Sequence, residues 1–319
     1  MTKIPPTTDP TLDAVNRSIE AIENAIPQRD YMGMSNLAEP CARKLFYQFR
    51  HAKAKDKKAK LIKCAEDGHA SELVQAARLR MVDGVTLHTV DPDTGKQFEY
   101  TWLNNAIQGH ADGKITGLIQ APRTEHIWEH KACNQKKYDA FTKCKDEFGE
   151  KECLKNWDIV YYGQAMLYLH FSGLSRHYLT VSLPGCRETQ SCRTEANPTY
   201  ALELLERAKK IIYSDSAPNK IHESPSWFYC KHFCDYYAIC HTKEELPQLN
   251  CRTCLHSTPE TAGGWSCAKL NEPIGSVMAC GGEMHLYLPD MLGGKAVDFE
   301  DGMVKYEDGR INYEGGRVE

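Results

Sequence analysis

The chain has 319 residues, of which 41% are hydrophobic, so it is long enough to bury a sizeable core in one main domain with a smaller appendage. Its formal net charge of −4 excludes a globally basic nucleic-acid-binding protein, and any contact with DNA must come from a local patch. The amino terminus lacks the apolar core of a secretory signal, and no segment reaches the length of a transmembrane helix. With fourteen cysteines, we therefore expect a reducing cytoplasm and metal sites before disulfides.

The first elements in chain order are a flexible segment and two helices. Residues 1–12 are rich in Pro and Thr and are predicted to form a disordered lead-in. Helical periodicity follows over residues 12–25 and stops before a proline. A second helix is predicted over residues 42–50, where apolar side chains form a stripe. Both helices are expected to pack on the core.

A basic run follows, with seven Lys or Arg residues against one acidic residue between positions 50 and 63. Such a run is usually a solvated helix or linker. In a nucleic-acid-binding protein it could instead follow phosphates, and each neutralised phosphate would steepen the salt dependence of binding. The residues that would make this contact are Lys53, Lys55, Lys57, Lys58 and Lys60.

The next predicted elements are a helix and a hairpin. The helix begins near His69 and continues to Gly84. Residues 85–105 then have the pattern of two strands joined by a turn at Asp93-Thr94-Gly95, which predicts a β-hairpin.

Acidic and basic residues gather in the segment after this hairpin. Period-two alternation over residues 126–131 places Glu129 and Lys131 on one face of a strand. Asp112 lies upstream, and two carboxylates of this kind can hold Mg²⁺ or Mn²⁺ while leaving room for water and a phosphate oxygen. Lys131 could then orient the attacking water or offset the charge on a phosphorane.

Each of these pieces also has a plainer interpretation. Glu-x-Lys on a strand is usually a solvated face with a weak ion pair, and Asp-Gly is more often a turn. The order of the pieces favours a common site, because a strongly apolar helix over residues 157–171 follows them. That helix carries Gln164 and Tyr168 four residues apart, and therefore on one face.

The rest of the first two-thirds of the chain supplies scaffold elements. Residues 133–156 are polar and charged, and their three cysteines, Cys133, Cys144 and Cys153, have no metal-ligand spacing and are interpreted as ordinary thiols. A strand is predicted over residues 178–183 and a helix over 198–213. The predicted fold class is α/β, with a mixed sheet flanked by helices.

The ordered set of polar residues resembles the RecB-like branch of the PD-(D/E)XK nuclease superfamily, including AddB-type nucleases, over roughly residues 30–242. The resemblance implies a restriction-endonuclease-like core that cleaves DNA with Mg²⁺ or Mn²⁺. In that family a helical histidine precedes the aspartate, and His69 matches it here. The implied metal ligands are His69, Asp112, Glu129 and the backbone carbonyl of His130. Lys131 would be the catalytic lysine, and Gln164 and Tyr168 would line the site and contact the DNA backbone.

Three cysteines, Cys230, Cys234 and Cys240, lie within eleven residues at the end of this region. The resemblance implies that they bind a four-iron, four-sulfur cluster together with Cys41, which would otherwise be a buried thiol. The cysteine spacing departs from that of the family, since three residues rather than two separate Cys230 from Cys234. The insertion contains His232, so a zinc site that uses this histidine stays open.

A second group of cysteines predicts a zinc-ribbon-like module over residues 246–319. A Cys-x-x-Cys pair, Cys251 and Cys254, is followed by Cys267 and Cys280, each separated from the preceding cysteine by twelve residues. His285 is a spare candidate ligand, and four unliganded thiols are the alternative. The segment is too poor in apolar residues for its own core, so we expect a bound metal to stabilise it. Short strands with turns at 301–302 and 308–309 end the chain.

The sequence therefore predicts a lead-in (1–12), a nuclease domain (13–245) and a cysteine-rich module (246–319). The resemblance implies a metal-dependent DNA nuclease, with an exonuclease expected, acting in recombination, repair or replication in the cytoplasm of a bacterial or phage-infected cell. It leaves room for a single-strand annealing or other recombination or replication partner and for an oligomer, but not for a membrane. The alternative is a catalytically silent nucleic-acid-binding or assembly protein on the same fold. Because every expected side chain is present, the nuclease is favoured; a redox enzyme fits less well without a nucleotide-binding glycine loop.

Overall fold

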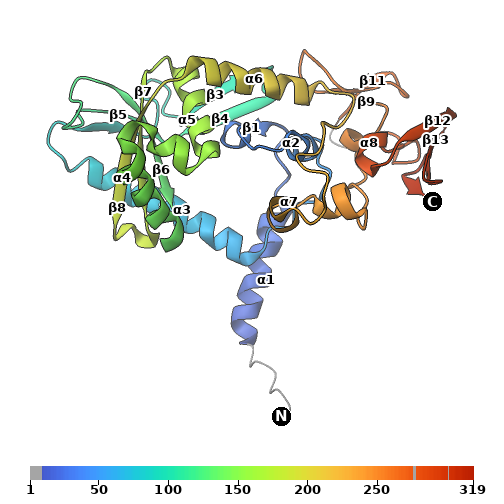
Figure 1. Cartoon of the computed structure of the whole chain (residues 1–319), viewed down its shortest axis with the longest axis horizontal. Coiled ribbons are helices and arrows are strands. Elements are labelled where there is room, and N and C mark those ends of the chain that lie inside the picture. Colours follow the sequence, from blue (N-terminus) through green and yellow to red (C-terminus); the bar gives the residue numbers. More distant parts are fainter. Residues whose placement is uncertain (1–8, 276–277, 301) are drawn as a thin grey trace, which may run out of the picture.

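The computed structural model describes residues 9–275, 278–300 and 302–319, and within them the protein is a mixed α/β chain with four sheets. The body's helices are α1 (Pro10–Ala25), α2 (Ala42–Phe49), α3 (Ala59–Leu79), α4 (Gln135–Trp157), α5 (Ile159–Ser172), α6 (Pro198–Ile212) and α7 (Phe228–Phe233), with short turns η1 (Met34–Asn36), η2 (Pro184–Cys186) and η3 (Ala238–Thr242). Figure 1 shows α4 and β8 at one end of the molecule and the carboxy-terminal strands at the other.

The central sheet has the strand order β2-β5-β6-β7-β8, and only β6 and β7 run parallel. Its strands are β2 (Thr86–His88), β5 (Gly113–Thr116), β6 (His126–Ala132), β7 (Arg176–Ser182) and β8 (Thr189–Glu195). Helix α3 covers one face, where Trp128 is buried with Ala76. Helix α5 covers the face on which Glu129 and Lys131 lie. The predicted mixed sheet flanked by helices is confirmed.

Helices α4 and α5 form the crossover between the parallel strands β6 and β7, which need a long connection of this kind. The sequence predicted α5 and α6 but not α4, because residues 133–156 are mostly polar. In the structure α4 is kinked at Gly149, where φ is 75°. Its buried side chains, including those of Cys144 and Cys153, lie against β8.

A second sheet has the order β1-β4-β3, with strands β1 (Met32–Gly33), β4 (Ile107–Ala111) and β3 (Phe98–Trp102). The predicted hairpin over 85–105 is wrong, since β2 pairs with β5 and β3 pairs with β4. The expected turn does form, with the Asp91 and Lys96 backbones hydrogen-bonded. A turn between two segments with strand alternation therefore does not show that the two strands pair with each other. The chain passes from the second sheet into the central one at Asp112.

One close approach in this second sheet determines the shape of the site. Gly109 on β4 lies against η1 and α5, and a Cβ added there would stand 2.6 Å from the Tyr168 ring and 2.8 Å from the Met34 sulfur. Since real Cβ atoms do not approach so closely, only glycine lets α5 pack against β4 at this point. The contact brings the Tyr168 hydroxyl to the backbone of His110.

Helix α1 is less integrated than its amphipathic pattern predicted, because it buries none of its side chains. Asp9 caps it, and it begins at Pro10, so the predicted disordered lead-in is wrong for residues 10–12; residues 1–8 lie outside the described range. Figure 1 shows α1 projecting away from the body. Glu23 joins it to the basic run through ion pairs with Lys55 at 3.0 Å and Lys57 at 2.8 Å.

The carboxy-terminal segment contains two small antiparallel sheets, of order β11-β10-β9 and β12-β13-β14-β15. Its elements are η4 (Cys251–Thr253), β9 (Ser257–Pro259), β10 (Trp265–Cys267), β11 (Glu272–Pro273), α8 (Pro289–Leu292), β12 (Ala296–Glu300), β13 (Met303–Tyr306), β14 (Ile311–Tyr313) and β15 (Arg317–Val318). The predicted strands near the end of the chain are confirmed, although residue 301 of one predicted turn lies outside the described residues. The segment has a small apolar cluster around Val304, contrary to expectation, and its Trp265 joins the main core.

In the described part of the chain, no helix combines the length and apolar character needed to cross a membrane.

Candidate active site

Glu129 and Lys131 lie two residues apart on β6 and interact directly. The Lys131 ammonium donates a hydrogen bond to Glu129 Oε2 at 2.8 Å. Gln164 on α5 donates to the same oxygen at 3.3 Å. The Glu129 side chain is 2% exposed and that of Lys131 is 20% exposed. The predicted strand face is therefore present, but helix α5 covers it, and solvent reaches the pair mainly at the lysine.

Asp112 lies beside this pair through two contacts with β6. Its backbone N–H donates to Glu129 Oε1 at 3.2 Å, and its Oδ2 accepts from the backbone N–H of His130 at 2.8 Å. In an extended strand the N–H and C=O of one residue point to the same edge. The His130 carbonyl is therefore directed to the edge where Asp112 lies, as its predicted role as a ligand requires.

The His130 side chain, by contrast, lies on the opposite face of the sheet. Its ring nitrogens contact Thr180 Oγ1 at 2.9 Å and Ser182 Oγ at 3.1 Å. Burial lowers the pKa of His130 to about 4, and the charge of Lys131 acts in the same direction, so the ring is neutral near pH 7. Thr180 Oγ1 also donates to the Glu129 carbonyl at 3.2 Å. This buried polar network holds β6 against β7 directly behind the candidate site.

Gln164 and Tyr168 share a face of α5, as predicted, and are hydrogen-bonded to each other at 3.2 Å. The Tyr168 hydroxyl donates to the His110 carbonyl at 2.9 Å, and the residue is only 2% exposed. Both side chains therefore orient the protein's own groups. Gln164 holds Glu129, and Tyr168 holds the backbone two residues before Asp112.

Glu72 on α3 is a further acidic residue of the site that the sequence analysis did not identify. Burial raises its pKa to about 7, the charge of Asp112 adds to this rise, and Lys131 opposes it. Glu72 therefore lies within electrostatic range of both residues. The sequence offered one indication of Glu72. It lies three residues after the candidate ligand His69, and residues at this spacing share a helix face.

His69 itself is exposed on α3. Among the contacts of the described residues, none joins it to Asp112 or Glu129. The structure thus brings together Asp112, Glu129, Lys131, Gln164 and Tyr168 and adds Glu72, but leaves His69 outside this set.

The charges in this cluster are unbalanced toward the acidic side. Burial raises the pKa of Glu129 to about 8, and the charge of Asp112 adds to the rise while Lys131 opposes it. Burial by itself would lower the pKa of Lys131, but the charges of Glu129 and Asp112 outweigh burial and raise it. Three carboxyl groups thus share one ammonium, which is a donor set suited to a hard divalent cation.

The first group of cysteines comes together around one small cavity, which Cys41, Cys230, Cys234 and Cys240 line. Cys41 is the N-cap of α2, and its sulfur accepts from the Lys44 backbone N–H at 3.4 Å. Burial, followed by the charge of neighbouring thiols, raises the pKa of Cys230. His232 is exposed, contacts the Phe228 ring at 4.9 Å and does not line this cavity.

The second group, Cys251, Cys254, Cys267 and Cys280, lines another small cavity in the carboxy-terminal segment. Burial and the three neighbouring thiols raise the pKa of Cys251 to about 11. The spare candidate His285 also lines this cavity, but its Nε2 contacts Asn250 O at 3.1 Å and Thr253 Oγ1 at 3.2 Å.

In the described residues, no group of three or more His, Cys, Asp or Glu side chains has the placement needed to hold a metal ion as those side chains stand. The carboxylates and the two groups of thiols therefore converge without forming ligand spheres.

The predicted DNA-binding lysines are mostly engaged with acidic residues of the same chain. In addition to the two that Glu23 pairs with, Lys53 lies 3.1 Å from Glu245 and Lys58 lies 2.7 Å from Asp56. Lys60 is exposed on α3. The ion pairs of Lys53, Lys57 and Lys58 are exposed and therefore weak, whereas Lys55 is mostly buried and also donates to the Glu23 and Ile26 carbonyls.

No protein-family model matches the sequence, and no curated protein matches it. Among solved structures, the chain is similar to that of SSO0001, with a TM-score of 0.38 and 13% identity over 73% of this chain and 96% of the other. It is also similar to an alkaline exonuclease (LHK-Exo) from Laribacter hongkongensis, with a TM-score of 0.39 and 13% identity over 61% of this chain and 90% of the other. The complex of LHK-Exo with dAMP gives a TM-score of 0.37 and 14% identity over 57% and 85% of the two chains. Because these TM-scores are low, the likeness does not establish a family or an activity for this chain.

Proposed function

We propose that this protein is a metal-dependent nuclease that hydrolyses phosphodiester bonds in DNA, with exonuclease action the expected mode. The observation that carries the proposal is the convergence of Asp112, Glu129 and Lys131 at the junction of β5 and β6. Their order and spacing are those of the nuclease superfamily that the sequence resembles.

The donor set suits Mg²⁺ or Mn²⁺, because carboxylate and carbonyl oxygens are the ligands that such ions prefer. Asp112, Glu129 and the His130 carbonyl would hold the ion, and α3 would supply Glu72 or His69. A bound ion would supply Lewis acidity toward a phosphate oxygen.

The remaining residues have roles that follow from their contacts. Lys131 carries the positive charge nearest the carboxylates and would offset the negative charge that develops on the phosphorane. Gln164 fixes the orientation of Glu129, and Tyr168 fixes the β4 backbone next to Asp112. The Tyr168 hydroxyl is buried and donates to the His110 carbonyl, so we assign the attack to water rather than to a protein side chain.

We further propose that the two groups of cysteines bind structural metals. The four thiols around Cys41 fit an iron–sulfur cluster, since they come from three separate elements and line one cavity. The four thiols around Cys251 fit a zinc ion in a ribbon-like module. His232 is not among the residues that line the first cavity and lies against the Phe228 ring, which favours the cluster over a zinc site with that histidine.

A cleavage assay tests the nuclease. End-labelled single- and double-stranded DNA is incubated with and without Mg²⁺ or Mn²⁺, and the parent chain is compared with Glu129→Ala and with Glu147→Ala, an exposed glutamate on α4. We expect metal-dependent cleavage by the parent and by Glu147→Ala but not by Glu129→Ala. If the folded parent binds DNA without cleaving it, the chain is instead a silent nucleic-acid-binding protein on the same fold.

A further inference from the structure

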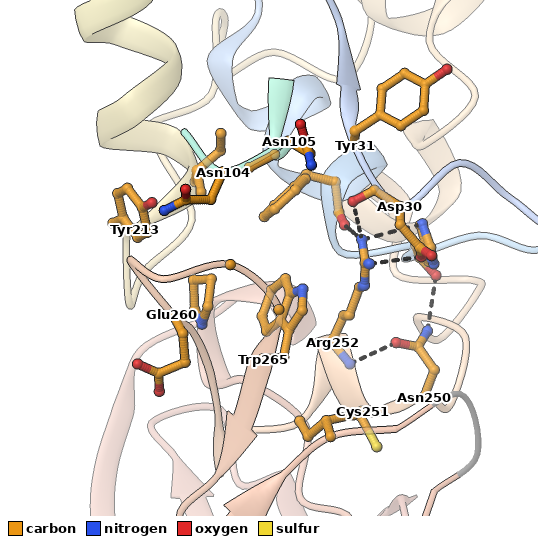
Figure 2. Close-up of a pocket in the computed structure, with 18 of the residues that line it drawn as sticks. Asp30, Tyr31, Asn104, Asn105, Tyr213, Asn250, Cys251, Arg252, Glu260 and Trp265 are labelled. Atoms are coloured by element: carbon orange, nitrogen blue, oxygen red, sulfur yellow. Dashed lines mark hydrogen bonds and ion pairs between the residues drawn. The ribbon is translucent and has the colours of Figure 1, made fainter. Parts of the chain in front are cut away.

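A cavity of about 560 Å³ lies where the carboxy-terminal segment meets the α/β body. The body contributes the tip of the β3–β4 turn, with Asn104 and Asn105, and the end of α6, with Tyr213. The cysteine-rich segment contributes Arg252 and Trp265. Figure 2 shows these five residues around one space, with the two asparagines on one side of it and Trp265 on the other. The cavity is separate from the carboxylates of the candidate active site.

The backbone of the β3–β4 turn presents amide side chains to this cavity. Leu103, Asn104 and Asn105 have consecutive positive φ values of 50°, 48° and 68°, a conformation that asparagine tolerates better than most residues. Asn104 Nδ2 donates to the Thr261 carbonyl at 2.6 Å and so ties the turn to the cysteine-rich segment. Within the described residues, the Asn105 amide group has no hydrogen-bond partner, so it is available to a ligand.

The charges of the cavity argue against a phosphate as that ligand. The Arg252 guanidinium donates to Asp30 Oδ1 at 2.8 Å and to the Phe49 carbonyl at 3.0 Å, and it lies over the Phe49 and Trp265 rings. Its charge is thus already compensated, and Glu260 adds a carboxylate to the lining. Amide groups and aromatic rings without a spare cation suit a neutral heterocycle, which they bind by edge hydrogen bonds and stacking.

Strand β4 connects this cavity with the candidate active site. Gln108 on β4 lines the cavity, and Asp112 directly follows the end of this strand, four residues further along the chain. At 3.3 Å per residue, four residues of extended chain span about 13 Å. An extended DNA strand spans this distance in a few nucleotides.

We propose that the cavity binds one nucleobase of a DNA strand whose backbone passes the carboxylate cluster. Asn105 would hydrogen-bond the edge of the base, and the half-buried Tyr213 ring would provide a stacking surface, since the Phe49 and Trp265 rings are buried against each other. This inference rests on the proposed function for its choice of DNA as the ligand. It gives the cysteine-rich segment a role, since that segment supplies one wall of the base site.

Binding measurements on DNA with a single missing base test the proposal. A series of labelled single strands carries one abasic site at successive positions from the end, and fluorescence anisotropy is measured on the full chain without divalent metal. For the parent, we expect one position at which base removal weakens binding about tenfold, the size typical of one good base contact. In Asn105→Gly, intact and abasic strands should bind equally well at that position.

Asn105→Gly is suited to this test because glycine tolerates the positive φ of the turn. Asn271→Gly is its matched control, since Asn271 also has a positive φ, 53°, is exposed and lies outside the cavity. The control should keep the position-dependent loss. Equal binding of every abasic strand by the parent, or an unchanged loss in Asn105→Gly, would overturn the base site.

The test separates this inference from the proposed nuclease. If the parent cleaves DNA in a metal-dependent way but binds intact and abasic strands equally well, the proposed nuclease activity is supported and the base site is contradicted. Conversely, the parent could lose affinity at one abasic position, lose this dependence in Asn105→Gly, and yet never cleave DNA. This result would support the base site and contradict the proposed nuclease activity.

Discussion

At the scale of single residues, strand periodicity predicted the pairing of Glu129 with Lys131, and helix periodicity predicted the pairing of Gln164 with Tyr168. These contacts are local, within four residues, so the sequence alone could supply them. Glu72 was not found because its partners, Asp112 and Lys131, belong to distant elements. Only the packing of α3 on β6 brings them together.

The role of Lys131 follows from its charge at the exposed side of the cluster. Lys131→Ala should lower the rate of DNA cleavage by about two to three orders of magnitude, the usual cost of losing one group that stabilises transition-state charge. DNA binding should change little, since one cation among many contacts is removed. Cleavage kinetics and binding are measured for this variant and for Lys114→Ala on the neighbouring strand. Normal turnover in Lys131→Ala would exclude this lysine from the mechanism.

The two candidates on α3 can be distinguished by parallel substitutions. Glu72→Gln keeps the side-chain shape but removes a charge beside Asp112, so we expect weaker activation by Mg²⁺ and Mn²⁺. His69→Gln should leave metal activation unchanged, because His69 is exposed and, among the contacts of the described residues, none joins it to Asp112 or Glu129. Cleavage is measured against metal concentration for both variants. Weaker metal activation in His69→Gln and unchanged activation in Glu72→Gln would instead make His69 the metal ligand on α3, as the family resemblance implies.

At the scale of secondary-structure elements, the sequence predicted those with a strong apolar or β-forming signal. Helix α6 was found from its regular stripe of buried positions, and β6, β7 and α5, which are buried along most of their length, from their apolar and β-forming residues. Helix α4 was missed because its polar surface masks a short buried stripe. The false hairpin shows a different limit, since strand pairing depends on β4 and β5, which the local pattern of residues 85–105 does not contain.

Strand β7 contains a residue that should make stability depend on pH. His177 is buried, and neither ring nitrogen has a hydrogen-bond partner among the described residues. Burial lowers its pKa to about 3, and the charges of Lys131 and His126 add to this. An unfolded histidine has a pKa near 6.5. Stability is therefore fully present above about pH 6.5 and is lost progressively as the pH falls toward 3.

The substitution His177→Phe should reduce this loss, because phenylalanine cannot take up a proton, and should stabilise the chain at pH 5. Other buried histidines, such as His130, keep part of the pH dependence. Denaturant unfolding at a series of pH values measures the effect, with His170→Phe on the exposed side of α5 as the control. Parallel curves for the parent and His177→Phe would show that His177 does not protonate on unfolding.

At the scale of the whole molecule, the cysteine-rich segment is joined to the body by packing. The Trp265 ring lies 5.4 Å from that of Phe49, and the Arg50 guanidinium lies over Trp265 and donates to the Arg252 carbonyl. The sequence predicted this segment as an appendage stabilised by metal, because cysteine spacing was its strongest signal. The aromatic and arginine contacts join residues about two hundred positions apart and leave no local pattern.

The proposed metal site around Cys41 would link residues that are far apart in the sequence, since Cys41 and Cys240 lie on either side of the α/β body in sequence. A metal bound there would close nearly the whole body into one loop and so restrict the unfolded chain. Cys230→Ser should therefore remove the visible absorption of protein prepared without oxygen and lower its thermal midpoint by several degrees. The exposed Cys64 provides the control, and Cys64→Ser should change neither quantity. Colourless parent protein with stoichiometric zinc would replace the cluster by a zinc site. Metal-free protein with the same midpoint in both variants would leave the four cysteines as unliganded thiols, and the body would then be held by its apolar core alone.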